Sequence, residues 1–222
     1  RIMKKCKFAF AVLLLNQTCS FPVSVTAAAH PHRGLLPPYE GSEARSIKLT
    51  NQQDQILLSG QSVKVSEKKG NGGRGFVIQD VHAPPQVIWE RILDFPGYTE
   101  MVPRVKSCDN YFLETFSDGS KNIKTAMTVS VLGAKINYFI EHKFQPDDQC
   151  LTWTLDYDRR SDLEESVGYW FVQGHPDPEL SSTGWSRVYY SVDVVTPSWL
   201  PGAVKQVMQG QALTQATAWV KK

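Results

Sequence analysis

The stretch DVHAPPQVIWERILDFPGYTEMVP, residues 80–103, is the most informative part of the sequence. Its two prolines at 84–85 end a short strand that we predict over Phe76–Val81, and the second proline suits the first turn of a helix. Apolar residues at helical spacing predict that helix over Gln86–Leu93, and an Asp-Phe-Pro-Gly run then breaks it. A second short helix is expected to end at Met101. The order here is therefore strand, helix, helix.

Downstream, six segments alternate between apolar and polar residues with the period of two that is typical of strands. Asp118-Gly119 and Pro146-Asp147-Asp148 are turn signals between neighbouring segments. Alternation of this length predicts an antiparallel sheet with one buried and one wet face. The six predicted strands cover Val105–Thr115, Ser120–Leu132, Lys135–Phe144, Leu151–Tyr157, Leu163–Gln173 and Trp185–Val195.

Upstream of residue 80, the sequence predicts one more helix and one more strand. Thr50 and Gln53 have the spacing of a capping box, so a short helix should begin after Thr50. Residues 61–68 alternate as a strand. Four glycines between residues 70 and 75 are interpreted as a flexible break, since the Gly-Lys-Ser/Thr ending of a phosphate-binding loop is missing.

The last segment changes from a period of two to a helical period. Pro197, Pro201 and Gly202 open it, and it predicts a helix of about 20 residues, about 30 Å long. Because no other element remains to cover the apolar face of the sheet, this helix should do so. The apolar residues at helical spacing are Leu200, Val204, Met208, Ala212 and Trp219.

Residues 80–103, with Ser166-Val167-Gly168-Tyr169-Trp170 and Trp185–Tyr190, resemble a known superfamily. The opening motif is similar to that of the START-like polyketide cyclase/dehydrase and lipid transport proteins, and within them to the coenzyme Q-binding START-domain branch. The resemblance covers about residues 50–222. It implies an α+β helix-grip fold: a curved seven-stranded antiparallel sheet packed on a long C-terminal helix, with two short helices after the first strand.

The resemblance also implies a hydrophobic cavity between the sheet and the C-terminal helix. Members of this superfamily bind lipids, quinones, polyketides or other apolar molecules, and some are cyclases or aromatases. They share no universal catalytic residue set that could be carried over, and a fold alone does not establish a function.

The N-terminal part of the chain reads as a targeting segment. Three lysines near Met3 precede an apolar run over Phe8–Leu15 and then small residues, which is the order of a secretory signal peptide. We therefore expect a signal peptide over residues 1–29, a disordered linker over 30–49 and a START-like domain over 50–222. The signal should lead into the secretory pathway; the alternative is the plastid of an alga, reached through a bipartite signal.

Charge and composition exclude some classes of protein. Hydrophobic residues make up 41% and aromatic residues 11% of the chain, which excludes a disordered chain. Four of the 24 basic residues and none of the 22 acidic residues lie in 1–29, so the remainder has 20 basic residues and a net charge of −2. Nucleic-acid binding is not expected, because it needs a clustered basic face.

The two cysteines outside the signal, Cys108 and Cys150, are expected to be free buried thiols. Their predicted strands lie about three strand spacings apart, roughly 14 Å, whereas a disulfide needs Cα atoms within about 7 Å. Neither a metal site nor a cofactor is predicted. No nucleophile elbow, paired-carboxylate spacing or dinucleotide-binding loop occurs in the sequence, and no catalytic residue is assigned.

His142 is the most conspicuous candidate site residue. It shares its strand face with Ile136, Tyr138, Ile140 and Phe144, so it should point where apolar groups point. The favoured interpretation is a histidine hydrogen-bonded at the sheet end, and the alternative is a group that orients a ligand. The candidate cavity residues are Met127, Tyr138, His142, Trp153, Tyr190, Val204, Met208 and Ala212.

Three functions remain open from the sequence. The first is binding or transfer of an apolar small molecule such as a lipid, quinone or isoprenoid, by a monomer in transient contact with a membrane. The second is a cyclase or aromatase, which would need polar groups such as His142 with Arg187 or Glu165 to converge in the cavity. The third is a protein-interaction or assembly module. We favour the first, without enzymatic activity.

Overall fold

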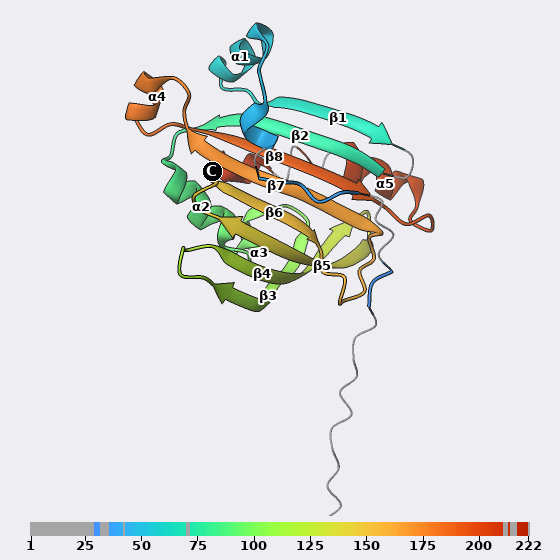
Figure 1. Ribbon diagram of the computed structural model, residues 1–222. Coiled ribbons are helices and arrows are strands. Elements are labelled where there is room, and N and C mark those ends of the chain that lie inside the picture. Colours follow the sequence, from blue (N-terminus) through green and yellow to red (C-terminus); the bar gives the residue numbers. More distant parts are fainter. Residues whose placement is uncertain are drawn as a thin grey trace, which may run out of the picture.

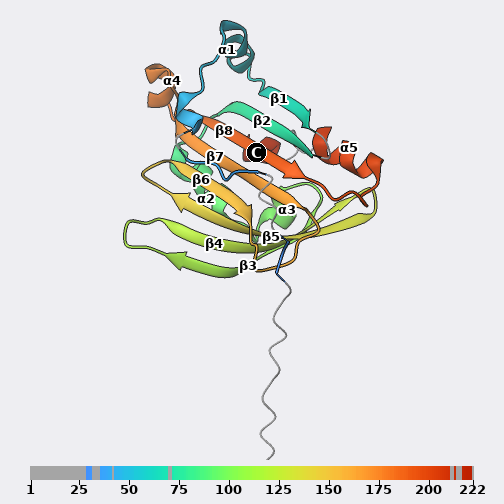
Figure 2. The ribbon, with the colours of Figure 1, turned by 45° about the vertical axis from the view of Figure 1, so that its right-hand side comes forward.

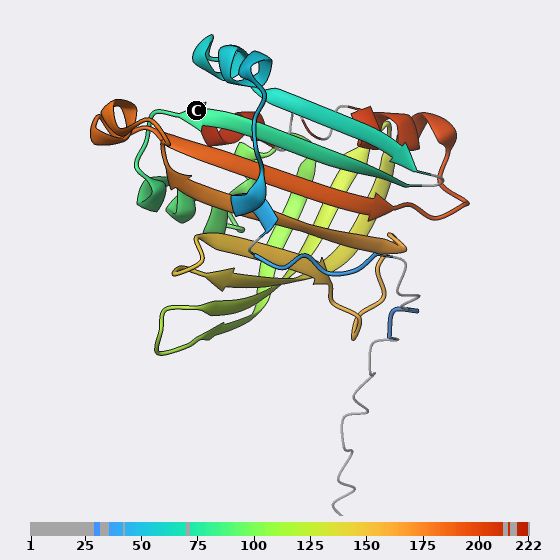
Figure 3. The same ribbon diagram turned by 45° about the horizontal axis from the view of Figure 1, so that its top comes forward.

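The computed structural model describes residues 29–31, 36–41, 43–69, 72–210, 213 and 217–221. One antiparallel sheet dominates it, with the strand order β1-β2-β8-β7-β6-β5-β4-β3 (Figure 1). Figure 3 shows that the sheet curls, so that its two ends approach each other around the helices. The strands are β1 (Val63–Lys69), β2 (Gly72–Val81), β3 (Val105–Thr115), β4 (Lys121–Val131), β5 (Ala134–Gln145), β6 (Cys150–Leu155), β7 (Glu165–Gly174) and β8 (Ser186–Val195).

Helices from both halves of the chain occupy the concave face of this sheet. Ile88, Trp89 and Ile92 of α2 and Tyr98 of α3 are buried in the same cluster as Trp219. Figure 2 shows α2 and α3 within the curve of the sheet, with α5 across the ends of β1 and β2. The helices are α1 (Asn51–Leu58), α2 (Pro85–Leu93), α3 (Tyr98–Met101), α4 (Pro178–Ser182) and α5 (Gly202–Gly210), and the 3-10 turns are η1 (Glu43–Ser46) and η2 (Trp219–Lys221).

The predicted α+β helix-grip architecture is confirmed, with one correction to the strand count. The sheet has eight strands rather than seven, because β1 pairs with β2 over seven residues, from Val63 opposite Ile78 to Lys69 opposite Gly72. The glycines at 72–75, interpreted as a break, belong to β2. A Cβ on Gly75 would overlap Leu213, with Leu213 Cγ 2.7 Å away, so glycine permits close approach of the terminal helical segment.

The predicted C-terminal helix is present as α5 and as helical residues at 213 and 217–218 before η2. Residues 211–212 and 214–216 lie outside the described residues. So do residues 1–28, which carry nearly all of the predicted signal peptide. Helix α4 was missed, because its five residues lie in a polar loop without apolar periodicity.

Part of the segment that we expected to be a disordered linker, 30–49, makes defined contacts in the described residues. Ser161 N donates to His30 Nδ1 at 3.2 Å, so His30 donates from Nε2 to the Glu164 carbonyl at 2.9 Å. Tyr39 donates its hydroxyl proton to Asp193 Oδ2 at 3.0 Å. These residues and buried Ala44 cover part of the convex face, which is therefore not wholly wet.

Cys108 and Cys150 are both buried and form no disulfide, as predicted. Three strand spacings separate their strands, β3 and β6. In addition, Cys108 packs in the cluster on the concave face, whereas Cys150 packs in the cluster on the convex face. The body of the sheet therefore separates the two thiols.

Candidate ligand-binding cavity

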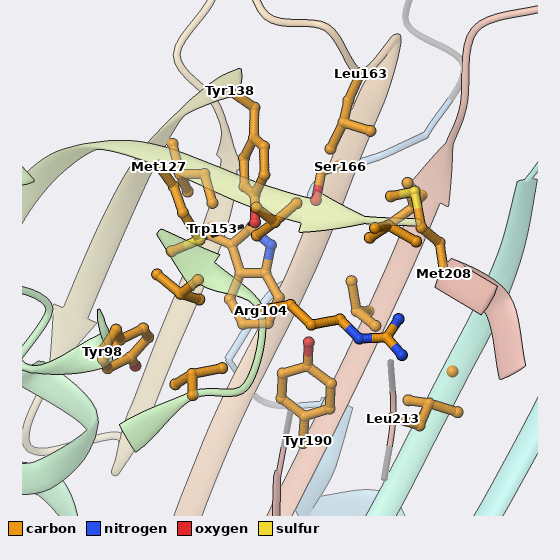
Figure 4. Close-up of a pocket in the computed structure, with 18 of the residues that line it drawn as sticks. Tyr98, Arg104, Met127, Tyr138, Trp153, Leu163, Ser166, Tyr190, Met208 and Leu213 are labelled. Carbon is orange, nitrogen blue, oxygen red and sulfur yellow. Dashed lines mark hydrogen bonds between the residues drawn. The ribbon is translucent and has the colours of Figure 1, made fainter. Parts of the chain in front are cut away.

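A cavity of about 260 Å³ lies between the concave face of the sheet, the α3–β3 connection and α5 (Figure 4). Its described lining is mainly apolar and aromatic, from β4, β5, β6, β7 and β8 on one side and α5 on the other. Ligand pockets are typically roughly 300–1,000 Å³, so this one, at about 260 Å³, lies just below that range. The exposed lining residues Ser66, Arg74 and Pro103 mark its mouth.

The structure brings six of the eight sequence-predicted site residues to this cavity: Met127, Tyr138, His142, Trp153, Tyr190 and Met208. Val204 does not line it; instead Val204 is buried in a separate cluster with Leu200 and Val131. Helical spacing correctly predicted that Val204 lies on the buried side of α5, but its side chain packs one turn away from the cavity. Ala212 lies outside the described residues.

An aromatic wall forms one side of the cavity. The rings of Trp153 and Tyr190 are stacked with centroids 5.7 Å apart, and Tyr190 also contacts Trp170 at 4.5 Å. Gly168 makes this possible, since a Cβ there would overlap the Trp153 ring and the Ser191 carbonyl. Trp153 therefore lies flat against β7, and its strand partner in the ladder is Gly168 itself.

His142 lies in the wall with 4% of its surface exposed. Its Nε2 is hydrogen-bonded to Thr125 Oγ1 at 3.1 Å, and its Nδ1 has no hydrogen-bond partner among the described residues. Burial lowers the pKa of His142 to about 3, so the ring is neutral at pH 7. The favoured interpretation predicted the internal hydrogen bond but placed the ring at the sheet end, away from the cavity that it lines.

The tyrosines of the cavity are also uncharged at neutral pH. Burial raises the pKa of Tyr138 and of Tyr190 well above the usual value. Tyr138 donates its hydroxyl proton to Met127 Sδ at 2.8 Å, which fixes the ring against the neighbouring strand. The wall can therefore offer hydrogen bonds without becoming ionised.

Sequence reasoning missed Arg104, Ser166 and Tyr98, which also line the cavity. Tyr98 is anchored by its hydroxyl, which donates to the Ile92 carbonyl at 2.6 Å. Ser166 is on the concave face of β7, and Arg104 lies in the α3–β3 connection. Strand alternation could have placed Ser166 inside with Gly168 and Trp170, but no pattern reveals the direction of a side chain in a connection such as that of Arg104.

Arg187 and Glu165, which the cyclase hypothesis requires, lie outside the cavity lining. Arg187 Nε donates to Asp80 Oδ1 at 2.7 Å, and His175 Nε2 lies 3.2 Å from Asp80 Oδ2, in a buried cluster at one end of β2 and β8. Glu165 accepts a hydrogen bond from Tyr157 at 3.0 Å. Glu165 and Arg187 also lie apart from each other, because the ladder sets Arg187 opposite Gln173 and Glu165 opposite Val195 at the other end of β7.

The part of the chain that the structure describes has neither a metal-ligand cluster nor a membrane-spanning helix. It contains no group of three or more His, Cys, Asp or Glu side chains that could hold a metal ion. Nor is any described helix long and apolar enough to cross a membrane.

No protein-family model matches the chain, and no curated protein matches it. Solved structures do match. A START superfamily protein from Mycobacterium smegmatis has a TM-score of 0.52 and 15% identity, over 67% of this chain and 94% of that one. An 18 kDa protein from Caulobacter crescentus has a TM-score of 0.52 and 14% identity, over 66% and 92% of the two chains. An aromatase/cyclase from Streptomyces sp. R1128 has a TM-score of 0.50 and 14% identity, over 67% and 88%.

Proposed function

The chain has the START-like helix-grip fold, and from the cavity inside it we propose that the protein binds an apolar small molecule. The observation that carries this proposal is the cavity of about 260 Å³, whose walls come from the strands, α5 and Trp219. Such a hollow with mainly apolar walls favours an apolar occupant, because each buried Å² of apolar surface contributes about 25 cal/mol.

Among apolar molecules we propose a lipid, quinone or isoprenoid. The stacked rings of Trp153 and Tyr190 offer a flat surface to a planar or polyunsaturated group, and Met127 and Met208 supply adaptable walls. The resemblance of residues 80–103 to the coenzyme Q-binding START-domain branch supports a quinone or isoprenoid. Binding and transfer fit this lining better than cyclisation, because Arg187 and Glu165 lie elsewhere.

We also propose that residues 1–29 direct the chain into the secretory pathway or, in an alga, to the plastid, where it would contact a membrane transiently to exchange its ligand. A fusion of residues 1–29 to a fluorescent protein tests the first step. Entry into the endoplasmic reticulum is expected, and a cytosolic fusion would overturn this part of the proposal.

Binding is tested with the neutral apolar fluorophore N-phenyl-1-naphthylamine. Its emission rises in apolar surroundings, and Trp153, Trp170 and Trp219 in the wall provide a second signal. We expect saturable binding of one fluorophore per chain. Non-saturable binding, or none at all, would contradict the proposed function.

A further inference from the structure

The cavity contains an arginine among its apolar walls. Figure 4 shows the side chain of Arg104 extending across the cavity in the direction of Met208 and Leu213. Arg74 also lines the mouth, but its Nε lies 3.8 Å from Asp193 Oδ1 and its guanidinium lies over the Tyr39 ring, on the convex side. No described lining residue carries a carboxylate. The described wall therefore contributes positive charge to the cavity and no negative charge.

The backbone of Arg104 adopts a conformation that is unusual for a residue with a Cβ atom. Its φ is +74°, in the left-handed region that costs a residue with a Cβ about 1–2 kcal/mol. Ser130 N donates to the Arg104 carbonyl at 2.9 Å and so holds this conformation. Glycine would adopt it without that cost. From this strained position the Arg104 side chain extends into the cavity.

Two hydroxyl groups point into the same space. Figure 4 shows the Tyr190 hydroxyl directed toward Arg104 and the Ser166 hydroxyl directed into the cavity beside Trp153. Ser166 is only 4% exposed, and both hydroxyls belong to residues that line the cavity. A hydroxyl that faces a cavity can take a bound ligand as its hydrogen-bond partner. A ligand with a polar end would supply such a partner.

We propose that the ligand is an amphipathic anion, with a carboxylate or phosphate head group at Arg104 and an apolar tail along Met127, Ile140 and Trp153. This inference rests on the proposed function and specifies the ligand further. A guanidinium donates two parallel hydrogen bonds to a carboxylate or phosphate, and such bonds strengthen where water is partly excluded. Arg104 follows exposed Pro103 at the mouth, so the head group stays near water while the tail enters.

The test uses three ligands with one tail: dodecanoate, dodecyl phosphate and 1-dodecanol, each below its micellar concentration. Their affinities are measured by displacement of N-phenyl-1-naphthylamine from the full-length protein. The variants are Arg104→Asn, because Asn tolerates a left-handed backbone, and Arg104→Lys, which keeps the charge but loses the planar fork. Urea unfolding of each variant confirms that it is folded.

We expect the wild type to bind at least one anion about 10-fold or more tightly than dodecanol, as a charge-assisted hydrogen bond predicts. Arg104→Asn should remove that preference and change dodecanol affinity by less than about 3-fold, while Arg104→Lys keeps part of it. The preferred anion separates a carboxylate from a phosphate head group.

Four results overturn the inference. Equal displacement by the alcohol and the anions, or an anion preference that survives in Arg104→Asn, removes the head-group assignment and leaves the proposed function standing. If none of the three ligands displaces the fluorophore, the head-group assignment also fails and the proposed function still stands. Failure of the fluorophore itself to bind the wild type refutes both the inference and the proposed function.

Discussion

Substitution of Gly75 by alanine tests how closely the terminal helical segment presses on the sheet. The new Cβ would overlap the Leu213 side chain, with Cγ and Cδ1 only 2.7 and 2.8 Å away. Leu213 is 5% exposed and lines the cavity, so it has little room to withdraw. Overpacking of this kind costs about 1–3 kcal/mol, and the lower backbone entropy of alanine in the unfolded chain offsets about 0.5–1 kcal/mol of it.

The energetic coupling between the two residues is the decisive quantity. Leu213→Ala alone should cost about 2–5 kcal/mol, since it leaves a buried hole. In the double variant the methyl group introduced at position 75 occupies part of that hole, so the two losses should combine to about 1–2 kcal/mol less than their sum. Gly202→Ala is the matched control, because a Cβ on Gly202 has no neighbour within 4 Å.

The assay is urea unfolding of the four proteins in the cycle, followed by tryptophan fluorescence and circular dichroism. A coupling energy near zero, with the Gly75 and Leu213 losses additive within about 0.5 kcal/mol, would refute the contact between β2 and the terminal helical segment. The stability losses of Gly202→Ala and Leu213→Ala should be additive. This control shows that the assay can distinguish coupled from uncoupled substitutions.

Two further predictions concern buried polar groups. The pKa of His142 is about 3 in the folded protein against 6.5 unfolded, so the unfolded chain binds more protons between those values and stability should fall as pH falls from about 6.5 to 3. His142→Gln should remove several kcal/mol of that acid sensitivity, at about 1.4 kcal/mol per pKa unit, and identical slopes of urea stability against pH for the two proteins would contradict it. Arg187→Met leaves Asp80 buried without its 2.7 Å partner and should cost about 3–5 kcal/mol in urea unfolding, with the fluorophore affinity of the folded fraction unchanged. If Arg187→Met lost less than about 1 kcal/mol of stability, or changed the fluorophore affinity, a buried Asp80–Arg187 pair outside the cavity would be contradicted.

Strand positions on the concave side were the part of the molecule best predicted from sequence. Alternation predicted strands over 120–132 and 135–144, and the structure has β4 at Lys121–Val131 and β5 at Ala134–Gln145. Since the side-chain period of a strand is two, one correct register also assigns the inward residues, which is why Met127 and Tyr138 were found. The predicted strands over 163–173 and 185–195 already separate Glu165 from Arg187, since two consecutive antiparallel strands set their starts at opposite ends, as β7 and β8 do.

The features that escaped prediction have no period. His30 and Tyr39 cover the convex face through individual hydrogen bonds from an irregular segment, and no repeating pattern marks them. Arg104 enters the cavity from the α3–β3 connection, where its own backbone is in the left-handed conformation. Glycine in β2 suggested a loop, although close approach to Leu213 is what requires it. In each instance a tertiary contact, rather than local propensity, determines the structure.

Native mass spectrometry of protein purified without detergent, with and without a cavity-filling substitution, gives the sharpest test of whether this cavity holds a small apolar molecule. Val192→Phe adds an aromatic ring at the cavity wall, and Val65→Phe makes the same change at a strand position that is 49% exposed. We predict one co-purifying apolar molecule per chain in the wild type and in Val65→Phe, and about 10-fold less in Val192→Phe. Equal ligand content in Val192→Phe and wild type, or no bound molecule in either, would contradict a ligand-binding role for the cavity.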